Sequence, residues 1–261
     1  MNDNTLPRAH FIPSYLQAPL HPVKITLVGA GGNGSQMLSA LARINIALKS
    51  LNHPGLHVTV WDPDTVEKPN IGRQLFAAGD IGQNKAVTLV SRFNRFYGTG
   101  WDAVPECITD KTEPGNIIIT CVDNVAARKL VANIFRTQKK NKNNNYPEEN
   151  TYYWLDLGNA QHTGQAILGS ISIEQPKTKK YETVPVLPTL DKEFSLSKLK
   201  DTDSGPSCSM AEALKKQDLF VNSALVQLAG SLLWSLFRDV ALDIRGFYMN
   251  LETMKVQPIK V

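Results

Sequence analysis

Apolar and polar positions along the first half of the chain predict alternating strands and helices. A continuous apolar run over 23–28 is typical of a buried parallel strand. From Ser35 to about Leu51, apolar residues recur at intervals of three and four, which marks one face of a helix. Because parallel strands are joined by helical crossovers, this alternation predicts an α/β fold with a Rossmann-like, doubly wound, largely parallel sheet. The same alternation places further strands over 57–62 and 116–124, followed by helices that end near residues 97 and 140.

The second half of the chain has a different pattern. Segment 151–159 forms another apolar run, and segment 163–173 alternates in part, as antiparallel strands do. Residues 208–237 follow a helical pattern and are expected to form one helix. The remaining residues predict a closing hairpin with strands around 246–251 and 254–260. We therefore expect antiparallel strands to extend the parallel sheet in the C-terminal half.

The domain organisation that follows is simple. Residues 1–22 are punctuated by prolines and are expected to be an irregular N-terminal segment. Residues 23–261 are expected to form a single domain with long loops at about 138–150 and 175–206. The second loop lacks periodicity, and a run of that length inside a compact domain is often functional.

Composition and charge exclude several classes of protein. The 261 residues carry a formal net charge of +4, with Lys and Arg partly concentrated in loops, which is weak evidence for nucleic-acid binding. The three cysteines form no C-x-x-C pair, which argues against a disulfide framework and predicts no structural zinc. No segment has the architecture of a secretory signal or the length of a membrane span, so a cytoplasmic protein is expected.

A glycine cluster follows the first strand and predicts a nucleotide site. Gly29, Gly31 and Gly34 match the pattern G-x-G-x-x-G, with Gly32 inside it, between a strand and a helix. Such glycines permit a tight turn, an approach of the backbone to phosphate, and close packing of the helix on the sheet. A glycine turn without a ligand is the alternative, and NAD, FAD and ATP all remain open at this point.

The residues after the second strand favour a triphosphate over a dinucleotide. Asp62 ends that strand, where an acid would bind a ribose, and Asp64 faces the same way two residues later. Arg73 and Lys85 follow, and their charges suit phosphate oxygens rather than NAD. The alternatives are a surface ion pair for Arg73, a solvated position for Lys85 despite the helix dipole, and a loop-fixing role for Asp64.

A third acidic position lies at the end of the next strand. Asp123 is expected at the carboxyl edge of the sheet, where open α/β sheets bind ligands. An acid facing phosphates there would suit Mg²⁺, which takes one or two carboxylates together with phosphate oxygens. Asp123 could also cap the helix that begins near Val125, and both roles are compatible.

These motifs in this order resemble the E1-like adenylating enzymes, the ThiF/MoeB/HesA superfamily. The resemblance rests on "GAGGNG", "DPDTVEKPNIGRQ", "DIGQNKA" and "CVDN…R" and covers roughly residues 23–130. Residues 155–169 and the C-terminal helix and hairpin extend it more weakly. The C-terminal part most resembles the ThiF-related proteins of PRTRC cassettes, a gene set of bacterial plasmids and mobile elements.

The resemblance implies ATP-dependent adenylation of a carboxylate with release of pyrophosphate. In this superfamily the carboxylate is usually the C-terminal glycine of a ubiquitin-like protein, ATP binds with Mg²⁺, and the enzyme is usually a homodimer. Chemically, such a reaction needs positioning and charge stabilisation and no base. By motif position, the glycines would form the phosphate turn, Asp62 would hold the ribose, Asn70, Arg73 and Lys85 would contact phosphates, Gln74 would support the site, and Asp123 would bind magnesium.

Two further residues enter through the same resemblance. Many relatives pass the acyl group to a cysteine, and Cys208 precedes a predicted helix, where a thiol pKa would fall. An incidental loop cysteine is the equal alternative. Relatives often supply an arginine from the partner subunit, and Arg8 lies in a suitable region, although its surroundings match poorly.

Other functions remain open beside this interpretation. Adenylation of a small molecule or of a modified tRNA base would use the same site and differ only in the acceptor. A non-catalytic E1-like binding subunit is a different class, but such subunits are expected to lose the phosphate-binding residues that this chain retains. A dehydrogenase is the least favoured alternative, and tight NAD(H) binding would support it.

Overall fold

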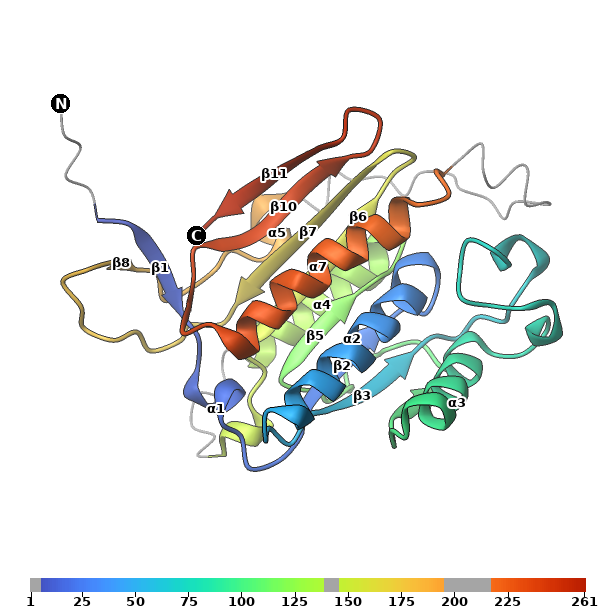
Figure 1. The fold of residues 1–261 in the computed structure, drawn as a ribbon, viewed down its shortest axis with the longest axis horizontal. Helices are drawn as coiled ribbons and strands as arrows, with labels where there is room; N and C mark the ends of the chain where they lie inside the picture. Colours follow the sequence, from blue (N-terminus) through green and yellow to red (C-terminus); the bar gives the residue numbers. More distant parts are fainter. Residues whose placement is uncertain (1–5, 139–145, 195–216) are drawn as a thin grey trace.

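The central element of the computed structural model is an eight-stranded sheet in the order β11-β10-β7-β6-β5-β2-β3-β4 (Figure 1). The structure describes residues 6–138, 146–194 and 217–261. Strands β4, β3, β2, β5 and β6 run parallel, and β7, β10 and β11 continue the sheet with antiparallel pairings. The predicted α/β fold with an antiparallel C-terminal extension is therefore confirmed. The strands are β2 (Val23–Val28), β3 (Leu56–Trp61), β4 (Asp102–Val104), β5 (Ile117–Thr120), β6 (Tyr153–Asn159), β7 (Thr163–Ser170), β10 (Ile244–Asn250) and β11 (Lys255–Lys260).

The order of the parallel strands reverses at β2. The chain proceeds from β2 to β3 and β4 on one side, and then returns to β5 and β6 on the other. Val28 pairs with both Trp61 and Thr120, so strands β2, β3 and β5 end at the same level. The residues that follow these strands therefore meet at one edge of the sheet, at the switch point where α/β proteins bind ligands.

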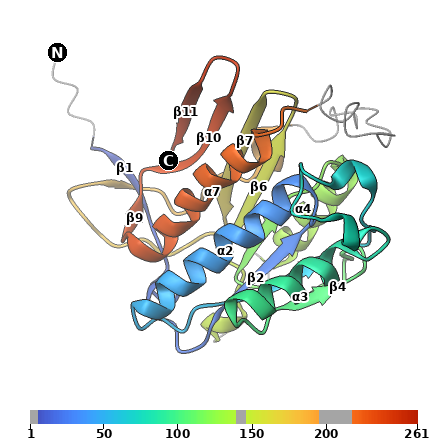
Figure 2. The ribbon, with the colours of Figure 1, turned by 45° about the vertical axis from the view of Figure 1, so that its right-hand side comes forward.

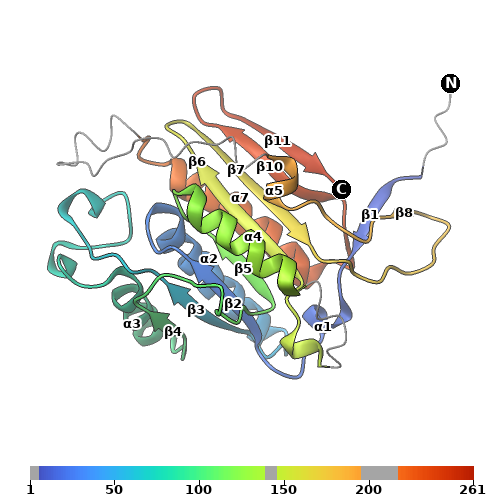
Figure 3. The same ribbon diagram turned by 180° about the vertical axis from the view of Figure 1, so that it is seen from behind.

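Helices cover both faces of the sheet. Helices α2 (Gly32–Ser50) and α7 (Val221–Arg238) lie side by side on one face, and α4 (Val125–Gln138) covers the other, as Figures 1 and 3 show. Helix α3 (Lys85–Tyr97) packs beside β3 and β4, as Figure 2 shows from a second angle. Gly230 in α7 faces Ala40 in α2 closely enough that a Cβ would contact the alanine, so small residues let the two helices pack tightly.

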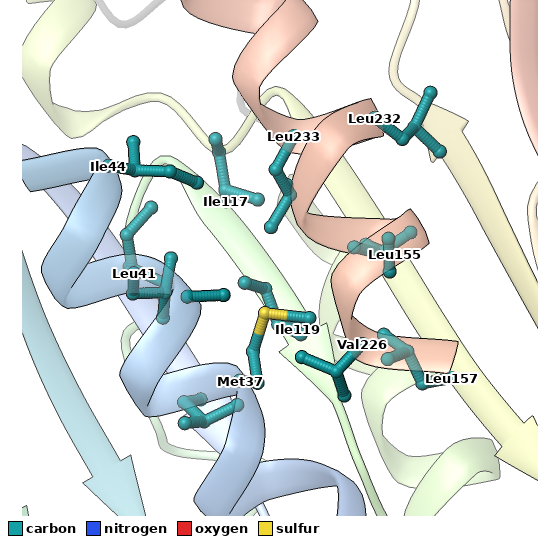
Figure 4. Close-up of a cluster of buried hydrophobic side chains, with 14 of the residues drawn as sticks. Met37, Leu41, Ile44, Ile117, Ile119, Leu155, Leu157, Val226, Leu232 and Leu233 are labelled. Atoms are coloured by element: carbon teal, nitrogen blue, oxygen red, sulfur yellow. The ribbon is translucent and has the colours of Figure 1, made fainter. Parts of the chain in front are cut away.

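The main core lies between the sheet and the pair α2 and α7. Strands with apolar side chains on both faces are typical of a parallel sheet that helices cover on both sides. Alternate residues of β5 serve the two faces: Ile117 and Ile119 pack in this main core, whereas Ile118 packs in a second cluster with α4. Figure 4 shows the main core, to which α2 contributes Met37, Leu41 and Ile44, α7 contributes Val226, Leu232 and Leu233, and β5 and β6 contribute Ile117, Ile119, Leu155 and Leu157.

Two predicted helices differ from the observed ones. The first begins at Gly32 rather than Ser35, so the glycine cluster itself forms the first turn of α2. The helix expected over 208–237 begins at Val221 among the described residues, and 217–220 form a turn instead. The carboxylate of Asp218 accepts a hydrogen bond from the backbone N–H of Phe220 at 2.8 Å, and such a local bond competes with helix formation.

The N-terminal segment, expected to be irregular, contains strand β1 (Arg8–Phe11) and the single-turn helix α1 (Ser14–Gln17). Strand β1 lies between β8 (Glu182–Thr183) and β9 (Ala241–Leu242) in a small second sheet. Strands this short form only beside partners that are distant in the sequence, so no local pattern could predict them. The expected division into 1–22 and a single domain over 23–261 stays a prediction.

The two expected long loops are only partly described. The described part of 175–206 contains β8 and the short helix α5 (Leu190–Glu193). The described part of 138–150 contains a 3₁₀ turn at Pro147–Glu149. Two further 3₁₀ turns, at Lys68–Asn70 and Ala78–Asp80, lie between β3 and α3. In the described part of the chain, no helix is both long enough and apolar enough to cross a membrane.

A buried histidine in β1 predicts how stability depends on pH. His10 is fully buried, with Nδ1 2.6 Å from the carbonyl oxygen of Val184 and Nε2 3.0 Å from the hydroxyl of Tyr153. Burial lowers the pKa of His10 in the folded chain, so the unfolded chain binds more protons below the ordinary value of about 6.5. Stability contributed by neutral His10 is therefore present above that value and is lost as the pH falls.

We expect the free energy of unfolding to decrease more steeply in the wild type than in His10→Gln between about pH 7.5 and about pH 5.5. Denaturant unfolding at a series of pH values measures this difference. His21→Gln, which removes an exposed histidine, serves as the control for the same substitution at the surface. Equal slopes for His10→Gln and the wild type would show that His10 does not titrate as its burial implies.

Candidate functional site

A cleft of about 1770 Å³ opens at the carboxyl ends of the parallel strands. Small-molecule sites usually enclose about 300–1,000 Å³, so this cleft has room for a nucleotide and part of a second molecule. The switch point of the sheet lies at its floor. The predicted site residues that line it are Gly29, Gly31, Gly32, Asp62, Asp64, Asn70, Arg73, Gln74, Lys85 and Asp123.

The glycine turn connects β2 to α2 in a conformation that side chains would prevent. Gly29 has a φ of 92°, and a Cβ there would lie 2.7 Å from the carbonyl oxygen of Cys121. A Cβ at Gly34 would lie 1.8 Å from the carbonyl oxygen of Gly29. Helix α2 therefore begins in direct contact with the end of β2, and its first N–H groups lie at the cleft, as anion sites at helix N-termini require.

Asp62 fixes the glycine turn as well as its own loop. One carboxylate oxygen accepts a hydrogen bond from the N–H of Ala30 at 2.6 Å, and the other accepts from the N–H of Asp64 at 2.8 Å. The side chain is buried, and this burial raises its pKa, while the two backbone donors and Lys85 oppose the rise. Each oxygen keeps a further acceptor site, so the carboxylate can still receive a ligand hydroxyl.

Asp64, in the loop after β3, forms an ion pair with Lys85, the first residue of α3. The ammonium Nζ of Lys85 lies 2.9 Å from Oδ2 of Asp64, with the lysine side chain 11% exposed and the aspartate side chain 64% exposed. The loop-fixing role that was left open for Asp64 belongs to Asp62, whose carboxylate accepts from the backbone N–H of Asp64. Lys85 is a desolvated cation inside the cleft rather than a solvated surface residue.

Asn84 is a site-forming residue that the sequence analysis missed. It is the N-cap of α3, where its side-chain oxygen accepts from the N–H of Val87 at 3.0 Å. Its side-chain nitrogen donates to the carbonyl oxygens of Asp62 and Asp64 at 2.8 and 3.1 Å. An asparagine directly before a helical run is a recognised capping pattern and could have identified it.

Arg73 projects from the loop after β3 and is held by two neutral oxygens. Its Nε donates to the carbonyl of Pro69 at 3.3 Å, and its Nη1 donates to Oε1 of Gln217 at 2.6 Å. Burial lowers the pKa of its guanidinium, which nevertheless stays charged at neutral pH. Among the described residues Arg73 therefore has neutral partners, in place of the surface ion pair that the sequence left open.

Asn70 and Gln74 flank Arg73 and differ in what their side chains do. Oδ1 of Asn70 accepts from the N–H of Glu67 at 2.8 Å, so this side chain shapes the 3₁₀ turn of its loop. Gln74 lies opposite the glycine turn, with Nε2 3.9 Å from where a Cβ of Gly31 would lie. Oε1 of Gln74 is buried and has no hydrogen-bond partner among the described residues. Gln74 therefore lies beside the glycine turn with one hydrogen-bond acceptor unused among the described residues.

Asp123 follows β5 and is exposed at the cleft. Asn124, not Asp123, acts as the cap of α4, since its Oδ1 accepts from the N–H of Ala127 at 2.7 Å. The expectation that Asp123 could cap this helix was therefore wrong, because α4 begins at Val125 and Asn124 is the residue directly before it. The described residues contain no group of three or more His, Cys, Asp or Glu side chains that could bind a metal ion without a ligand's help.

A second arginine lies farther along the cleft. Nε of Arg128 in α4 donates to Oδ1 of Asp156 at 2.9 Å, and Nη2 donates to the carbonyl of Leu157 at 3.2 Å. Asp156 is fully buried, and this burial raises its pKa, while Arg128 and Thr120 oppose the rise. An acid inside an otherwise apolar strand could have indicated Asp156 from sequence, since a buried charge needs a partner.

Cys208 lies outside the residues that the structure describes. Arg8 in β1 forms an ion pair with Glu182, with Nε 3.6 Å from Oε1 and both side chains mostly exposed. Figure 1 places β1 at the opposite end of the molecule from the carboxyl ends of β2 and β3. A contribution of Arg8 to the cleft of its own chain is thus excluded, whereas a role in a partner's cleft stays a prediction.

Comparisons with known proteins agree with this geometry. The family model described as "ThiF family" matches residues 5–257. The chain is 31% identical over 121 residues to "Adenylyltransferase and sulfurtransferase UBA4" of Yarrowia lipolytica, which covers 44% of this chain and 28% of that protein. It is 30% identical over 126 residues to the "NEDD8-activating enzyme E1 catalytic subunit" of Dictyostelium discoideum, which covers 46% of this chain and 26% of that protein. The chain thus matches about a quarter of the length of these relatives.

Solved structures support the fold. The crystal structure of E. coli MccB matches 95% of this chain and 65% of its own, with a TM-score of 0.58 and 15% identity. The crystal structure of PaaA matches 95% of this chain and 67% of its own, with a TM-score of 0.58 and 13% identity. At these identities, the likeness shows a shared fold and no more.

The contact between Gly34 and Gly29 predicts a steric effect. Gly34→Ala places a methyl group against the carbonyl of Gly29, so the start of α2 must move away from β2. We expect a loss of about 1–3 kcal/mol in the free energy of unfolding, measured by denaturant titration. Gly79→Ala is the control, because a Cβ there meets nothing within 4 Å. Equal stabilities of the two variants would contradict the close approach.

Proposed function

Because the chain belongs to the ThiF family, we propose that it uses ATP to adenylate a carboxylate and releases pyrophosphate. One observation carries the proposal: the N-terminus of α2, Arg73 and Lys85 line the same cleft as the buried carboxylate of Asp62. A helix N-terminus and two cations suit a polyphosphate, whereas a dinucleotide site needs only the glycine turn and the acid.

The roles follow from the contacts. The N–H groups of the glycine turn would bind phosphate oxygens, and Asp62 would accept hydrogen bonds from the ribose hydroxyls. Lys85 would release Asp64 and bind a phosphate oxygen instead, since its flexible side chain can move the ammonium from one anion to the other. Arg73 would bind the phosphates with the donors that Pro69 and Gln217 leave unused.

The reaction needs no general base. A carboxylate with an ordinary pKa of about 3.3–3.7 is ionised at neutral pH and is already a nucleophile. Its oxygen would attack the α-phosphorus, and the bond between that phosphorus and the oxygen bridging to the β-phosphate would break. Negative charge then accumulates on the departing pyrophosphate, where Arg73 and Lys85 would stabilise it.

Magnesium fits the cleft only together with the nucleotide. Asp123 supplies one exposed carboxylate at the cleft, and the described residues offer no complete set of metal ligands. Mg²⁺ commonly takes one or two carboxylates, with water and phosphate oxygens completing its octahedron. We therefore propose Asp123 as its protein ligand, and the ion would neutralise phosphate charge when bound.

The proposed carboxylate is the C-terminal glycine of a ubiquitin-like protein. The names of the relatives support this class, because one is a NEDD8-activating subunit and another is an adenylyltransferase. The size of the cleft is compatible with an extended peptide end beside the nucleotide. A homodimer, the role of Arg8 in a partner's site and closeness to the PRTRC-associated proteins stay predictions.

Exchange of radiolabelled pyrophosphate into ATP, with candidate carrier proteins present, tests the proposed reaction. We expect Arg73→Ala and Lys85→Ala each to reduce the exchange rate about 10²–10³-fold, the usual cost of removing one charge-stabilising donor. Arg43→Ala removes an exposed arginine of α2 whose side chain donates to Oε1 of Gln227. This variant should leave the rate unchanged. Absence of exchange with every carrier, in protein that binds ATP, would contradict adenylation of a carrier protein.

Transfer of the acyl group to Cys208 is a separate prediction. We expect Cys208→Ala to retain pyrophosphate exchange and to lose any adduct with the carrier that a reducing agent cleaves. Gel electrophoresis with and without the reducing agent measures the adduct. Cys107→Ala, which removes an exposed cysteine, is the matched control. If the adduct persists in Cys208→Ala, the thioester forms elsewhere.

A further inference from the structure

Gln217 connects Arg73 to the beginning of helix α7. Its Oε1 accepts from Nη1 of Arg73 at 2.6 Å, and its Nε2 donates to Oδ1 of Asn222 at 3.2 Å. A guanidinium only donates hydrogen bonds, so the amide must face Arg73 with its oxygen and Asn222 with its nitrogen. The orientation of Gln217 is therefore determined by its two partners.

Asn222 extends this connection to the phosphate turn. The side chain is 2% exposed, and a Cβ placed on Gly32 would lie 2.5 Å from its Nδ2. Asn222 thus packs directly against the first residue of α2. Through the Gln217–Asn222 bridge, helix α7 holds both Arg73 and the N-terminus of α2, two elements that line the cleft from different parts of the chain.

The partners of Arg73 leave its charge available. Both recorded acceptors, the Pro69 carbonyl and the Gln217 amide, are neutral. Arg128, in the same cleft, is instead paired with the carboxylate of Asp156. A carboxylate at position 217 would hold Arg73 equally well but would compete with any anion for it. A neutral amide orients the guanidinium and does not compete.

We propose that Gln217 is a positioning residue for Arg73: it aims the guanidinium at the phosphates of a bound nucleotide without neutralising it, and Asn222 fixes it relative to α2. The inference rests on the proposed function, since it takes the anion in the cleft to be the triphosphate of ATP. It assigns to α7 a part in nucleotide binding that is separate from its packing on the sheet.

Calorimetric titration of the full chain with ATP and with adenosine tests this role. Gln217→Ala should weaken ATP binding about tenfold, the scale of one hydrogen bond to a charged group. Gln217→Glu should weaken it further, because the nearly isosteric carboxylate pairs with Arg73. Adenosine, which lacks phosphates, should bind all variants equally. Gln227→Ala removes a glutamine of α7 that bonds the exposed Arg43, and it should bind ATP like the wild type.

The order of the two substitutions separates positioning from a structural role. A glutamine that only stabilised the fold would make Gln217→Glu the milder change, since it keeps the acceptor and the shape. The inference is overturned if Gln217→Glu binds ATP as well as Gln217→Ala or better. In an Arg73→Ala background, Gln217→Glu should have no further effect on ATP affinity. An additive effect there would show that Gln217 acts independently of Arg73 and would also overturn the inference.

These outcomes are distinct from a failure of the proposed function. Wild-type protein that does not bind ATP at all would reject the nucleotide site, and the inference with it. Wild-type protein that binds ATP, with Gln217 variants that bind it equally well, would reject the inference alone. Thermal unfolding of each variant, measured in parallel, confirms that the compared proteins are folded.

Discussion

Everything at the site depends on how closely helix α2 begins to the end of strand β2. A Cβ on Gly34 would lie 1.8 Å from the carbonyl oxygen of Gly29, so the two backbones meet with no side chain between them. The carboxylate of Asp62 then secures the turn by accepting from the N–H of Ala30 at 2.6 Å. These contacts join β3 to the turn, and α3 joins the same loop through Asn84. The end of the cleft at the glycine turn is therefore assembled from backbone and buried polar groups.

Three cations that line the cleft are held in different ways. Lys85 has a mostly exposed acidic partner, Arg128 has a buried one, and the recorded partners of Arg73 are neutral. Exchange of an exposed acid for a phosphate costs little desolvation, whereas removal of a partner from a buried acid costs much more. The proposed roles follow this order: Arg73 and Lys85 serve the phosphates, and Arg128 remains bound to Asp156.

Local patterns were sufficient to predict four of the five parallel strands, all but β4, and part of the lining of the cleft. The apolar runs, the glycines and the acids at strand ends each occur within a few residues of what they control, and the topology brings strand ends together without further information. Ten of the predicted residues therefore line one cleft. Their chemical roles, however, remain proposals.

Most features that the sequence did not predict depend on contacts between residues that are far apart in the chain. The bond between Gln217 and Arg73 joins residues 144 positions apart, and that between His10 and Val184 joins residues 174 apart. Contacts between such distant residues leave no periodic pattern of apolar positions in the sequence. The same holds for the short strands β1, β8 and β9, which depend on each other. The start of α7 was missed because a side chain, that of Asp218, competes locally with a helical pattern that otherwise continues.

The proposed function requires that this glycine turn hold the phosphates of ATP rather than a dinucleotide. Parallel calorimetric titrations of the wild-type chain with ATP and Mg²⁺, and with NADH, distinguish the two ligands. We expect saturable binding of ATP at one site per chain and no heat of binding with NADH. Tight binding of NADH together with no binding of ATP would contradict it.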